Sequence, residues 1–377
     1  MILNKRKLPT HLKLGYLALG LILLLLVGYW WEWRHWVALA YEQKAPHWFQ
    51  SLVQTIYPRF GVEKQRFPLD FFLQKADQVM LRFALVGVGT IIFLSLRQFQ
   101  SSFGKKVRHY WDGSTSRLNV SWHLRGFAGL MLLFTWDWYF YLKNLEQARV
   151  FYAPIFPYRL LQLPFPAPHW LLVFCGVFWL ANLAMLAKIK VFWSSTLSVF
   201  FFILLQGYMY CFHKLDHTYA TLTYVALLVP ILAWYYEKSR RQGCSQAAAW
   251  PWRMMQILIA LVYFQAGLEK LLIGGLEWLN PQNFRAYLYM HPTTLGAWLS
   301  QSDFWCVVLP LGALVTQLGF ISIIFYPRLK WLFIPLGIAF HLSTYLLLGI
   351  GWYYSPWMLV YLFLVDWTPT QQKNNPK

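Results

Sequence analysis

The sequence predicts an all-α polytopic integral membrane protein with about nine to ten transmembrane helices and no sizeable soluble domain. Hydrophobic residues make up 58% of the 377 residues and charged residues only 12%, whereas about 25% of the residues in a soluble domain are charged. Apolar runs of about 18 or more residues recur, and each can cross a hydrocarbon core about 30 Å thick. The basic residues lie in short clusters between these runs, as cytoplasmic loops do.

The net charge of +19 is explained by these clusters. No soluble segment combines a basic face with a core of its own, so we expect the lipid bilayer as a partner and no nucleic acid. Short cytoplasmic loops are enriched in Lys and Arg, which places both termini in the cytoplasm. We therefore expect a multi-pass protein of a plasma or inner membrane.

Residues 1–118 are predicted to form an N-terminal extension with two transmembrane helices. The first helix, Leu14–Trp31, follows a basic start, as a signal peptide would. Its apolar stretch continues into an aromatic segment, and the only small-residue site comes about ten residues too late for cleavage. We therefore expect an uncleaved helix. The second helix is Val79–Leu96, and the external loop between them, Glu32–Gln78, is rich in aromatic residues that favour membrane interfaces.

Residues 119–368 are predicted to hold the remaining transmembrane helices, and residues 369–377 to form a polar tail. Short basic turns or polar loops separate the apolar runs, so consecutive helices are expected to be antiparallel. The predicted spans are His123–Leu142, Leu171–Leu186, Val191–Phe212, Thr218–Tyr236, Trp252–Trp278, Phe304–Tyr326, Trp331–Ile350 and Tyr353–Asp366.

The span Trp252–Trp278 is the most informative, because it carries Glu269 and Lys270 near one end. Ionisable groups at membrane depth are costly and are usually functional. One interpretation is a lysine that extends its amine to the interface, where the charge stays hydrated. The other is a base, because an amine among apolar side chains loses the hydration that stabilises its charged form. The sequence alone leaves both open.

Two histidines fall in the same external half of the membrane as Lys270 under this topology. His217 follows Asp216 where one span begins, and His341 interrupts another span about nine residues from its external end. A histidine can relay a proton or hydrogen-bond a polar substrate group. Each residue also has a structural explanation: His217 at a helix boundary, Asp216 as a helix cap, and His341 in a hydrogen bond between helices.

Several short motifs occur in a recognisable order. Gln256–Trp278 reads QILIALVYFQAGLEKLLIGGLEW, Asp216-His217-Thr218-Tyr219 precedes an apolar helix, His341 lies in AFHL, and Arg125 lies in LRGFAGLMLL. Over about 250 residues these motifs resemble the membrane part of vitamin K-dependent gamma-carboxylase. They also resemble the wider family with a horizontally transferred transmembrane (HTTM) domain, whose main motif combines Gln, Val-Tyr-Phe, Ala-Gly, Lys-Leu and an acidic-Trp pair.

The resemblance implies that Lys270 corresponds to the base that deprotonates vitamin K hydroquinone, and His217 to an upstream functional histidine. A reduced quinone would then be the cofactor. The reaction would couple quinol oxidation by O₂ to removal of a glutamate γ-proton and addition of CO₂, in a secreted or membrane peptide on the external side. The remaining candidate positions, one catalytic and five supporting, are His341, Glu269, Asp216, Arg125, Tyr263 and Gln256.

The sequence departs from the carboxylase in several ways, including Leu215-Asp216 where the carboxylase has Asn-Asn and an N-terminal region, residues 1–118, without a counterpart. The carboxylase has adjacent lysines where this chain has Glu269-Lys270, and its large extramembrane substrate-binding domain has no counterpart in these 377 residues. The expected function is therefore broader: a membrane-embedded enzyme that uses Lys270 as a base on a lipid-soluble, quinol-like substrate, by carboxylase- or epoxidase-like chemistry. The alternative is a non-catalytic membrane protein, such as a maturation or assembly partner or an immunity or transport component.

Overall fold

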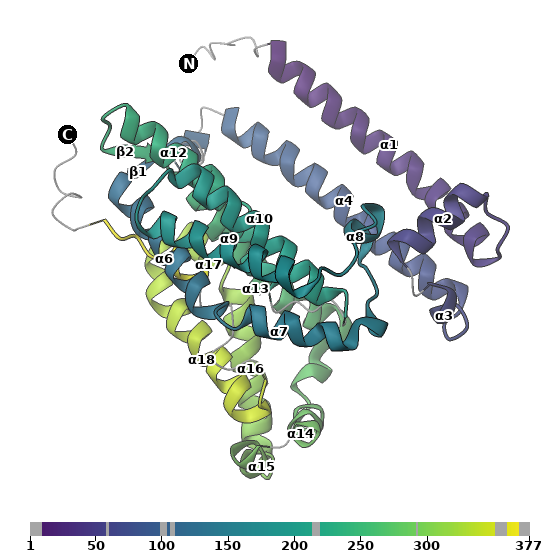
Figure 1. Cartoon of the computed structure of the whole chain (residues 1–377). Helices are drawn as coiled ribbons and strands as arrows, with labels where there is room; N and C mark the ends of the chain where they lie inside the picture. Colours follow the sequence, from purple (N-terminus) through teal and green to yellow (C-terminus); the bar gives the residue numbers. More distant parts are fainter. Residues whose placement is uncertain are drawn as a thin grey trace, which may run out of the picture. The chain divides into compact units, whose positions relative to one another are not determined.

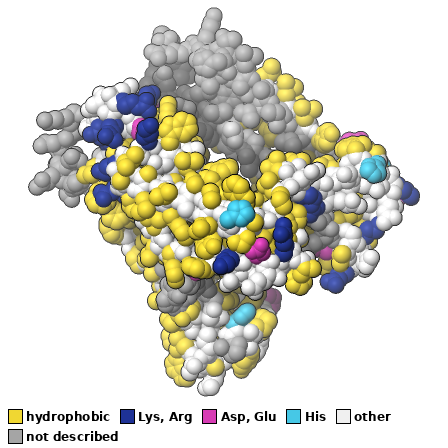
Figure 2. Space-filling model, in the orientation of Figure 1, with side chains coloured by type: hydrophobic (Ala, Val, Ile, Leu, Met, Phe, Trp, Pro, Cys, Tyr) yellow, Lys and Arg dark blue, Asp and Glu magenta, His cyan; other side chains and the backbone are white. Residues whose placement is uncertain are grey.

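A computed structural model describes residues 10–57, 60–98, 104–105, 110–212, 219–291, 293–350 and 360–368 (Figure 1). The regular secondary structure of this part is helical apart from one two-stranded ribbon. Hydrophobic side chains cover much of the face shown in Figure 2, and Lys and Arg gather in small groups. The predicted class, an all-α polytopic membrane protein, is confirmed. Six helices of the described part are long and apolar enough to cross a membrane: Pro168–Leu186, Val191–Tyr210, Ala220–Arg241, Trp250–Leu279, Asp303–Phe325 and Pro327–Leu348.

The chain forms two compact units, residues 1–109 with 156–163 and residues 110–155 with 164–377. The division into an extension up to residue 118 and an HTTM-like domain stays a prediction. The first unit includes the helices α1 (Thr10–Tyr41), α2 (His47–Ile56), α3 (Phe60–Glu63), α4 (Leu69–Gln98) and α8 (Phe156–Leu160).

The first unit is organised by α1 and α4, which pack along each other. Gly87 of α4 provides a close approach, because a Cβ there would overlap the side chain of Leu23. Asp77 of α4 forms an ion pair with Arg34 and accepts a hydrogen bond from the indole of Trp30 at 2.8 Å. The two long helices, of 32 and 30 residues, contain the predicted first and second spans.

The second unit contains the six candidate spans. Its elements are β1 (Ser114–Ser116), α6 (Arg117–Phe134), α7 (Trp138–Leu145), η1 (Glu146–Phe151), α9 (Pro168–Leu186), α10 (Val191–Tyr210), α11 (Ala220–Ala226), α12 (Val229–Arg241), β2 (Gln246–Ala248), α13 (Trp250–Gly274), η2 (Gly275–Leu279), α14 (Pro281–Met290), α15 (Thr294–Leu299), α16 (Asp303–Gly319), α17 (Ser322–Phe325), η3 (Pro327–Leu329), α18 (Lys330–Leu348) and η5 (Tyr361–Leu364).

The two-stranded ribbon fixes where two helices begin. Strands β1 and β2 pair antiparallel, with Ser114 opposite Ala248 and Ser116 opposite Gln246. The chain enters α6 directly after β1 and enters α13 one residue after β2. Both helices therefore begin at the same end of the second unit, which gives a common reference for the depth of residues along them.

Two predicted spans differ from the structure. The third, predicted over residues 123–142, is divided: α6 ends at Phe134 and α7 begins at Trp138. The Thr135 hydroxyl donates to the Met131 carbonyl at 2.6 Å, a local bond of the kind that bends or interrupts helices. Of the tenth span, predicted over residues 353–366, residues 353–359 lie outside the described part. Its described remainder contains the short 3₁₀ helix η5 rather than an α-helix.

Candidate functional site

Three of the predicted site residues lie on one face of α13. Gln256, Tyr263 and Lys270 are spaced seven residues apart, and seven residues bring an α-helix to within about 20° of two full turns. Pro251 occupies the first turn, where its missing N–H removes no hydrogen bond. Gly275 ends the helix with a φ of 55°, a conformation that glycine adopts without strain. The face therefore presents three polar groups at successive intervals of about 10 Å.

The middle position of this face belongs to a hydrogen-bonded cluster that we call the Tyr–His–Tyr network. The hydroxyl of Tyr263 lies 2.5 Å from Nε2 of His341 on α18 and is hydrogen-bonded to the hydroxyl of Tyr361 on η5. Both tyrosines are buried and His341 is half-buried. A phenol can donate one hydrogen bond and accept another, so the network connects three separate elements of the unit through one oxygen.

Aromatic stacking and one glycine hold the network in place. The ring of Phe320 stacks on that of Tyr263, with centroids 4.3 Å apart and an interplanar angle of 12°. The ring of Tyr361 lies nearly parallel to Phe320 at 6.1 Å. Gly337 lies one turn before His341 on α18, and a Cβ there would overlap the Tyr361 hydroxyl. The network therefore requires a residue without a side chain at position 337.

Gln256 forms a second polar layer, nearer the ribbon. Its amide Nε2 donates to the backbone carbonyl of Phe363 at 3.0 Å, and the indole of Trp252 donates to the same oxygen at 2.6 Å. Lys330 Nζ donates to Gln256 Oε1 at 3.2 Å. Backbone groups at membrane depth must find partners within the protein unless they face water. Gln256 and Trp252 therefore seat the short helix η5 against α13.

Lys270 lies on the same face as Tyr263, about 10 Å farther along α13. Its amine donates to the carbonyl of Ala266 at 3.3 Å and lies 5.4 Å from the ring centroid of Trp278. The side chain is half-buried, and the adjacent Glu269 is exposed. Within the described residues no carboxylate lies within ion-pair distance of Nζ. A helix carbonyl and an indole face thus replace part of its hydration.

The structure does not bring all predicted residues together. His341 contacts Tyr263 rather than Lys270. Arg125 is eight residues into α6 and Lys270 twenty residues into α13, which separates them by about 18 Å in depth from the ribbon. The Arg125 guanidinium lies 5.3 Å from the ring centroid of Trp122. Asp216 and His217 lie outside the described residues.

A pair of short helices, which we call the α14–α15 cap, follows the Lys270 end of α13. The ring of Tyr287 on α14 lies 6.0 Å from that of Trp278, the same indole that covers the Lys270 amine. Thr293 caps α15 and its hydroxyl also lies 2.9 Å from the carbonyl of Leu346 at the end of α18. The cap is therefore in contact with both helices that carry the site.

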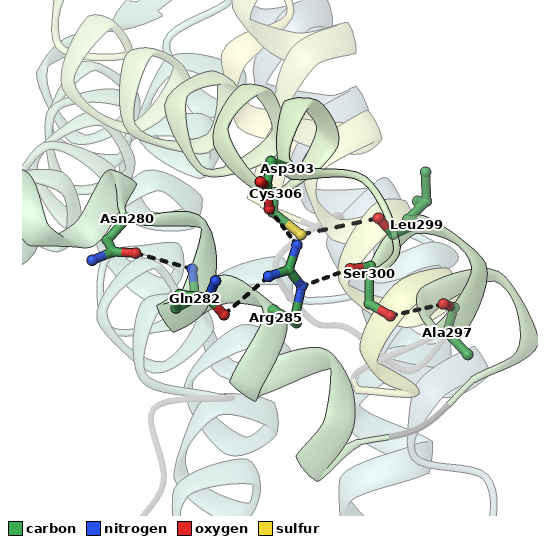
Figure 3. Close-up of polar contacts among 8 residues, drawn as sticks. All are labelled: Asn280, Gln282, Arg285, Ala297, Leu299, Ser300, Asp303 and Cys306. Atoms are coloured by element: carbon green, nitrogen blue, oxygen red, sulfur yellow. Dashed lines mark hydrogen bonds and ion pairs between the residues drawn. The ribbon is translucent and has the colours of Figure 1, made fainter.

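Arg285 holds the cap together (Figure 3). Its Nε donates to the carbonyl of Ser300 at 2.7 Å, and its Nη1 donates to Gln282 Oε1 at 2.9 Å. Its Nη2 forms an ion pair with Asp303 at the start of α16. The planar guanidinium can serve these three partners at once because its donors point in fixed directions. One side chain thus joins α14, the end of α15 and α16.

Sequence reasoning missed several residues of this region. Tyr361, Phe320 and Gly337 complete the Tyr–His–Tyr network, and none was among the predicted site residues. A phenol in an otherwise apolar run such as Tyr361 was the available signal, since a buried tyrosine hydroxyl usually finds a partner. His123 was also missed: it is fully buried, with its ring 5.3 Å from Trp252.

No family model, curated protein or solved structure matches this chain. Its chemistry must therefore be inferred from the groups present. An amine, two phenols and an imidazole all exchange protons or hydrogen-bond a polar substrate. Lys270 is half-buried, and its amine lies against the ring of Trp278.

Proposed function

We propose that the second unit is an HTTM-type membrane domain and an enzyme that uses Lys270 as a base on a lipid-soluble, quinol-like substrate. The observation that carries the proposal is the environment of the Lys270 amine, which contacts the carbonyl of Ala266 and the ring of Trp278 instead of a carboxylate. Partial burial against the indole removes water that would otherwise stabilise the charged amine, which suits Lys270 to act as a base. The order and spacing of the sequence motifs support the same assignment.

Lys270 and the Tyr–His–Tyr network have separate roles in this proposal. A reduced quinone, when bound, would supply an acidic hydroxyl and two electrons. Lys270 Nζ would accept the hydroxyl proton, and the flat indole of Trp278 would pack against an aromatic ring. Tyr263, held between His341 and Tyr361, would fix the shape of the site and offer a polar contact about 10 Å farther into the membrane.

The test is an assay of quinol oxidation by the purified full-length protein in detergent or nanodiscs. Vitamin K hydroquinone is the probe, and the change in quinone absorbance measures its oxidation. Lys270→Ala should abolish the activity, because no described residue contacting Lys270 carries a basic side chain. Lys238→Ala is the matched control, since Lys238 also lies over an indole, 5.2 Å from Trp234. Full activity in Lys270→Ala would refute the catalytic assignment.

A second measurement separates the general proposal from the narrower carboxylase reaction. Labelled CO₂ would be offered with the quinol and a glutamate-containing peptide, and incorporation into the peptide would be counted. Quinol oxidation without incorporation would support the Lys270 base and exclude glutamyl carboxylation of that peptide. Incorporation that Lys270→Ala removes and Lys238→Ala retains would support the carboxylase-like reaction.

We further propose that both termini are cytoplasmic and that Lys270 is on the external side. The chain carries a natural probe for this orientation: Cys244 is exposed, whereas Cys175, Cys211 and Cys306 are buried. Cys244 lies between α12 and β2, which the proposal places in the cytoplasm. A membrane-impermeant maleimide should label Cys244 only after permeabilisation of the cells. Labelling of intact cells that Cys244→Ser removes would reverse the orientation.

A non-catalytic role is the second candidate, and one observation favours it. Tyr263, His341 and Tyr361 bond to one another, and Gln256 bonds to the backbone of Phe363, so these polar groups already serve the fold. A protein that acts as an assembly or maturation partner would need no base. Under this candidate, the double variant Lys270→Ala, His217→Ala would be expressed normally and would rescue the phenotype of a deletion strain. The catalytic proposal requires that this variant fails to rescue it.

A further inference from the structure

The first unit contains a cavity whose lining residues include none of the groups around Lys270. Its volume is about 710 Å³, and α1, α2, α3 and α8 contribute to its walls. Pockets of about 300–1,000 Å³ are typical of small-molecule sites. Gly61 on α3 lines the cavity, and a Cβ there would meet no atom within 4 Å. The cavity is therefore large enough for a ligand and open beside Gly61.

The charges that line the cavity are positive. Lys64 and Arg159 both contribute to its surface, and no acidic side chain occurs among the lining residues in the described part of the chain. Lys64 Nζ lies 5.5 Å from the ring centroid of Tyr41, which holds its long side chain beside the cavity. Arg159 is fixed by hydrogen bonds from Nη1 to the carbonyls of Gln54 and Thr55 at 2.9 and 3.4 Å. Two positively charged side chains held in place favour the binding of an anionic ligand.

Amide groups add uncharged hydrogen-bonding capacity. Gln43, Gln54 and Gln65 line the cavity with exposed side chains. A fourth glutamine, Gln50, uses its amide to bond the carbonyls of Gln43 and Ala45 at 3.1 and 2.7 Å, which ties α2 to the turn after α1. Amides donate to phosphate oxygens and also bind hydroxyl groups. The lining thus suits a phosphate that carries a polar, hydroxylated substituent.

The position of the cavity along α1 allows two sources of such a ligand. The apolar stretch of α1 ends near Trp31, and Ala40, which lines the cavity, lies nine residues farther on, about 13 Å along the helix. Headgroups extend roughly 5–8 Å beyond the hydrocarbon core. The aromatic residues Trp33 and Trp36 between these points suit that interfacial layer. The cavity is therefore close to lipid headgroups and also reachable from water.

We propose that this cavity binds a phosphate ester with a small polyol substituent, either as an anionic phospholipid headgroup or as a soluble molecule. Lys64 and Arg159 contact the phosphate, and the glutamine amides contact the substituent. The cavity shares no lining residue with the groups proposed to react at Lys270, since every lining residue belongs to the first unit.

The test uses the purified full-length protein and two probes. Calorimetry in an uncharged detergent measures binding of glycerol phosphate, and flotation measures retention on phosphatidylcholine vesicles with and without phosphatidylglycerol. Lys64→Gln should weaken binding about tenfold, and Gly61→Phe should block it by filling the open space without changing charge. Lys75→Gln is the matched control, because Lys75 also lies over a ring, 5.7 Å from that of Phe71, but does not line the cavity.

Each outcome decides the proposal. Binding of glycerol phosphate that depends on Lys64 and Gly61 supports the site with a soluble source. Binding seen only with phosphatidylglycerol vesicles, with the same dependence, supports it with a lipid source. Binding of neither probe overturns the proposal. Equal weakening by Lys64→Gln and Lys75→Gln also overturns it, because the effect would then come from surface charge, and so does binding that Gly61→Phe leaves unchanged.

Discussion

Replacement of Gly337 by alanine tests whether the Tyr–His–Tyr network depends on the close approach of α18 and η5. A Cβ at Gly337 would overlap the hydroxyl of Tyr361 and would lie 2.8 Å from its Cζ and 3.3 Å from Cε2 of Phe320. Cβ contacts below 3.0 Å force a neighbour to shift. The atoms in the way belong to the buried ring of Tyr361, which must therefore shift. We expect this shift to break the hydrogen bond between Tyr361 and Tyr263.

The expected cost follows from these contacts. Overpacking a tightly packed site costs about 1–3 kcal/mol, and the lost hydrogen bond adds about 1 kcal/mol. Alanine also favours a helix over glycine by about 1 kcal/mol. Gly312→Ala on α16 shares this gain without the clash, because its Cβ would meet no atom within 4 Å. Gly337→Ala should therefore be about 2–4 kcal/mol less stable than Gly312→Ala.

Unfolding of the purified variants in detergent, followed by intrinsic tryptophan fluorescence, measures this difference. Tyr361→Phe provides an internal check, because it removes the hydroxyl that the new Cβ would overlap. In that background the penalty of Gly337→Ala should shrink by about 1 kcal/mol or more. The reasoning is refuted if Gly337→Ala is as stable as Gly312→Ala, or if its penalty is the same with and without the Tyr361 hydroxyl.

Three further predictions concern other polar contacts of the second unit. Gln256→Leu should destabilise the protein by about 1–3 kcal/mol in the same unfolding assay, because it removes a donor to a backbone carbonyl of η5. The control Gln265→Leu, at an exposed site of α13, should have little effect. Arg285→Lys should increase amide hydrogen exchange over residues 281–303, since an ammonium cannot reproduce three directed hydrogen bonds. If the exposed control Arg328→Lys exchanges as fast over these residues, the role of Arg285 is contradicted. Ser198→Ala should cost about 1 kcal/mol, as it removes the hydroxyl that donates to a buried amide of α9 at 2.9 Å, and unchanged stability would speak against that bond.

The sequence predicted the fold class and the longest helices because both depend on local composition. Length and apolarity can be read from the sequence, and the six candidate spans of the described residues satisfy that criterion. The common face of Gln256, Tyr263 and Lys270 could also be read directly, since a spacing of seven is a property of one helix. Helix interruptions were harder to predict from the sequence. The interruption near Thr135 depends on a hydrogen bond from its side chain, within a stretch of sequence that remains apolar.

The partners of the site residues could not be predicted, because they depend on which helices become neighbours. His341 was expected to lie in the external half with Lys270, but its contact with Tyr263 depends on the lateral position and rotation of α18. Tyr361 escaped notice because η5 is too short for a periodic pattern. The positions of Asp216 and His217 stay predictions, since both lie outside the described residues.

The seating of η5 has a consequence for the order in which the protein is made. Its contacts join residues far apart in the sequence: Trp252 and Gln256 bond to Phe363 across 111 and 107 positions, and Asn119 bonds to Trp367 across 248. During synthesis, the earlier helices enter the membrane before the segment that satisfies these side chains has left the ribosome. Until residues 361–367 emerge, the polar groups of Trp252, Gln256 and Asn119 lack these partners and must be hydrated or bonded elsewhere.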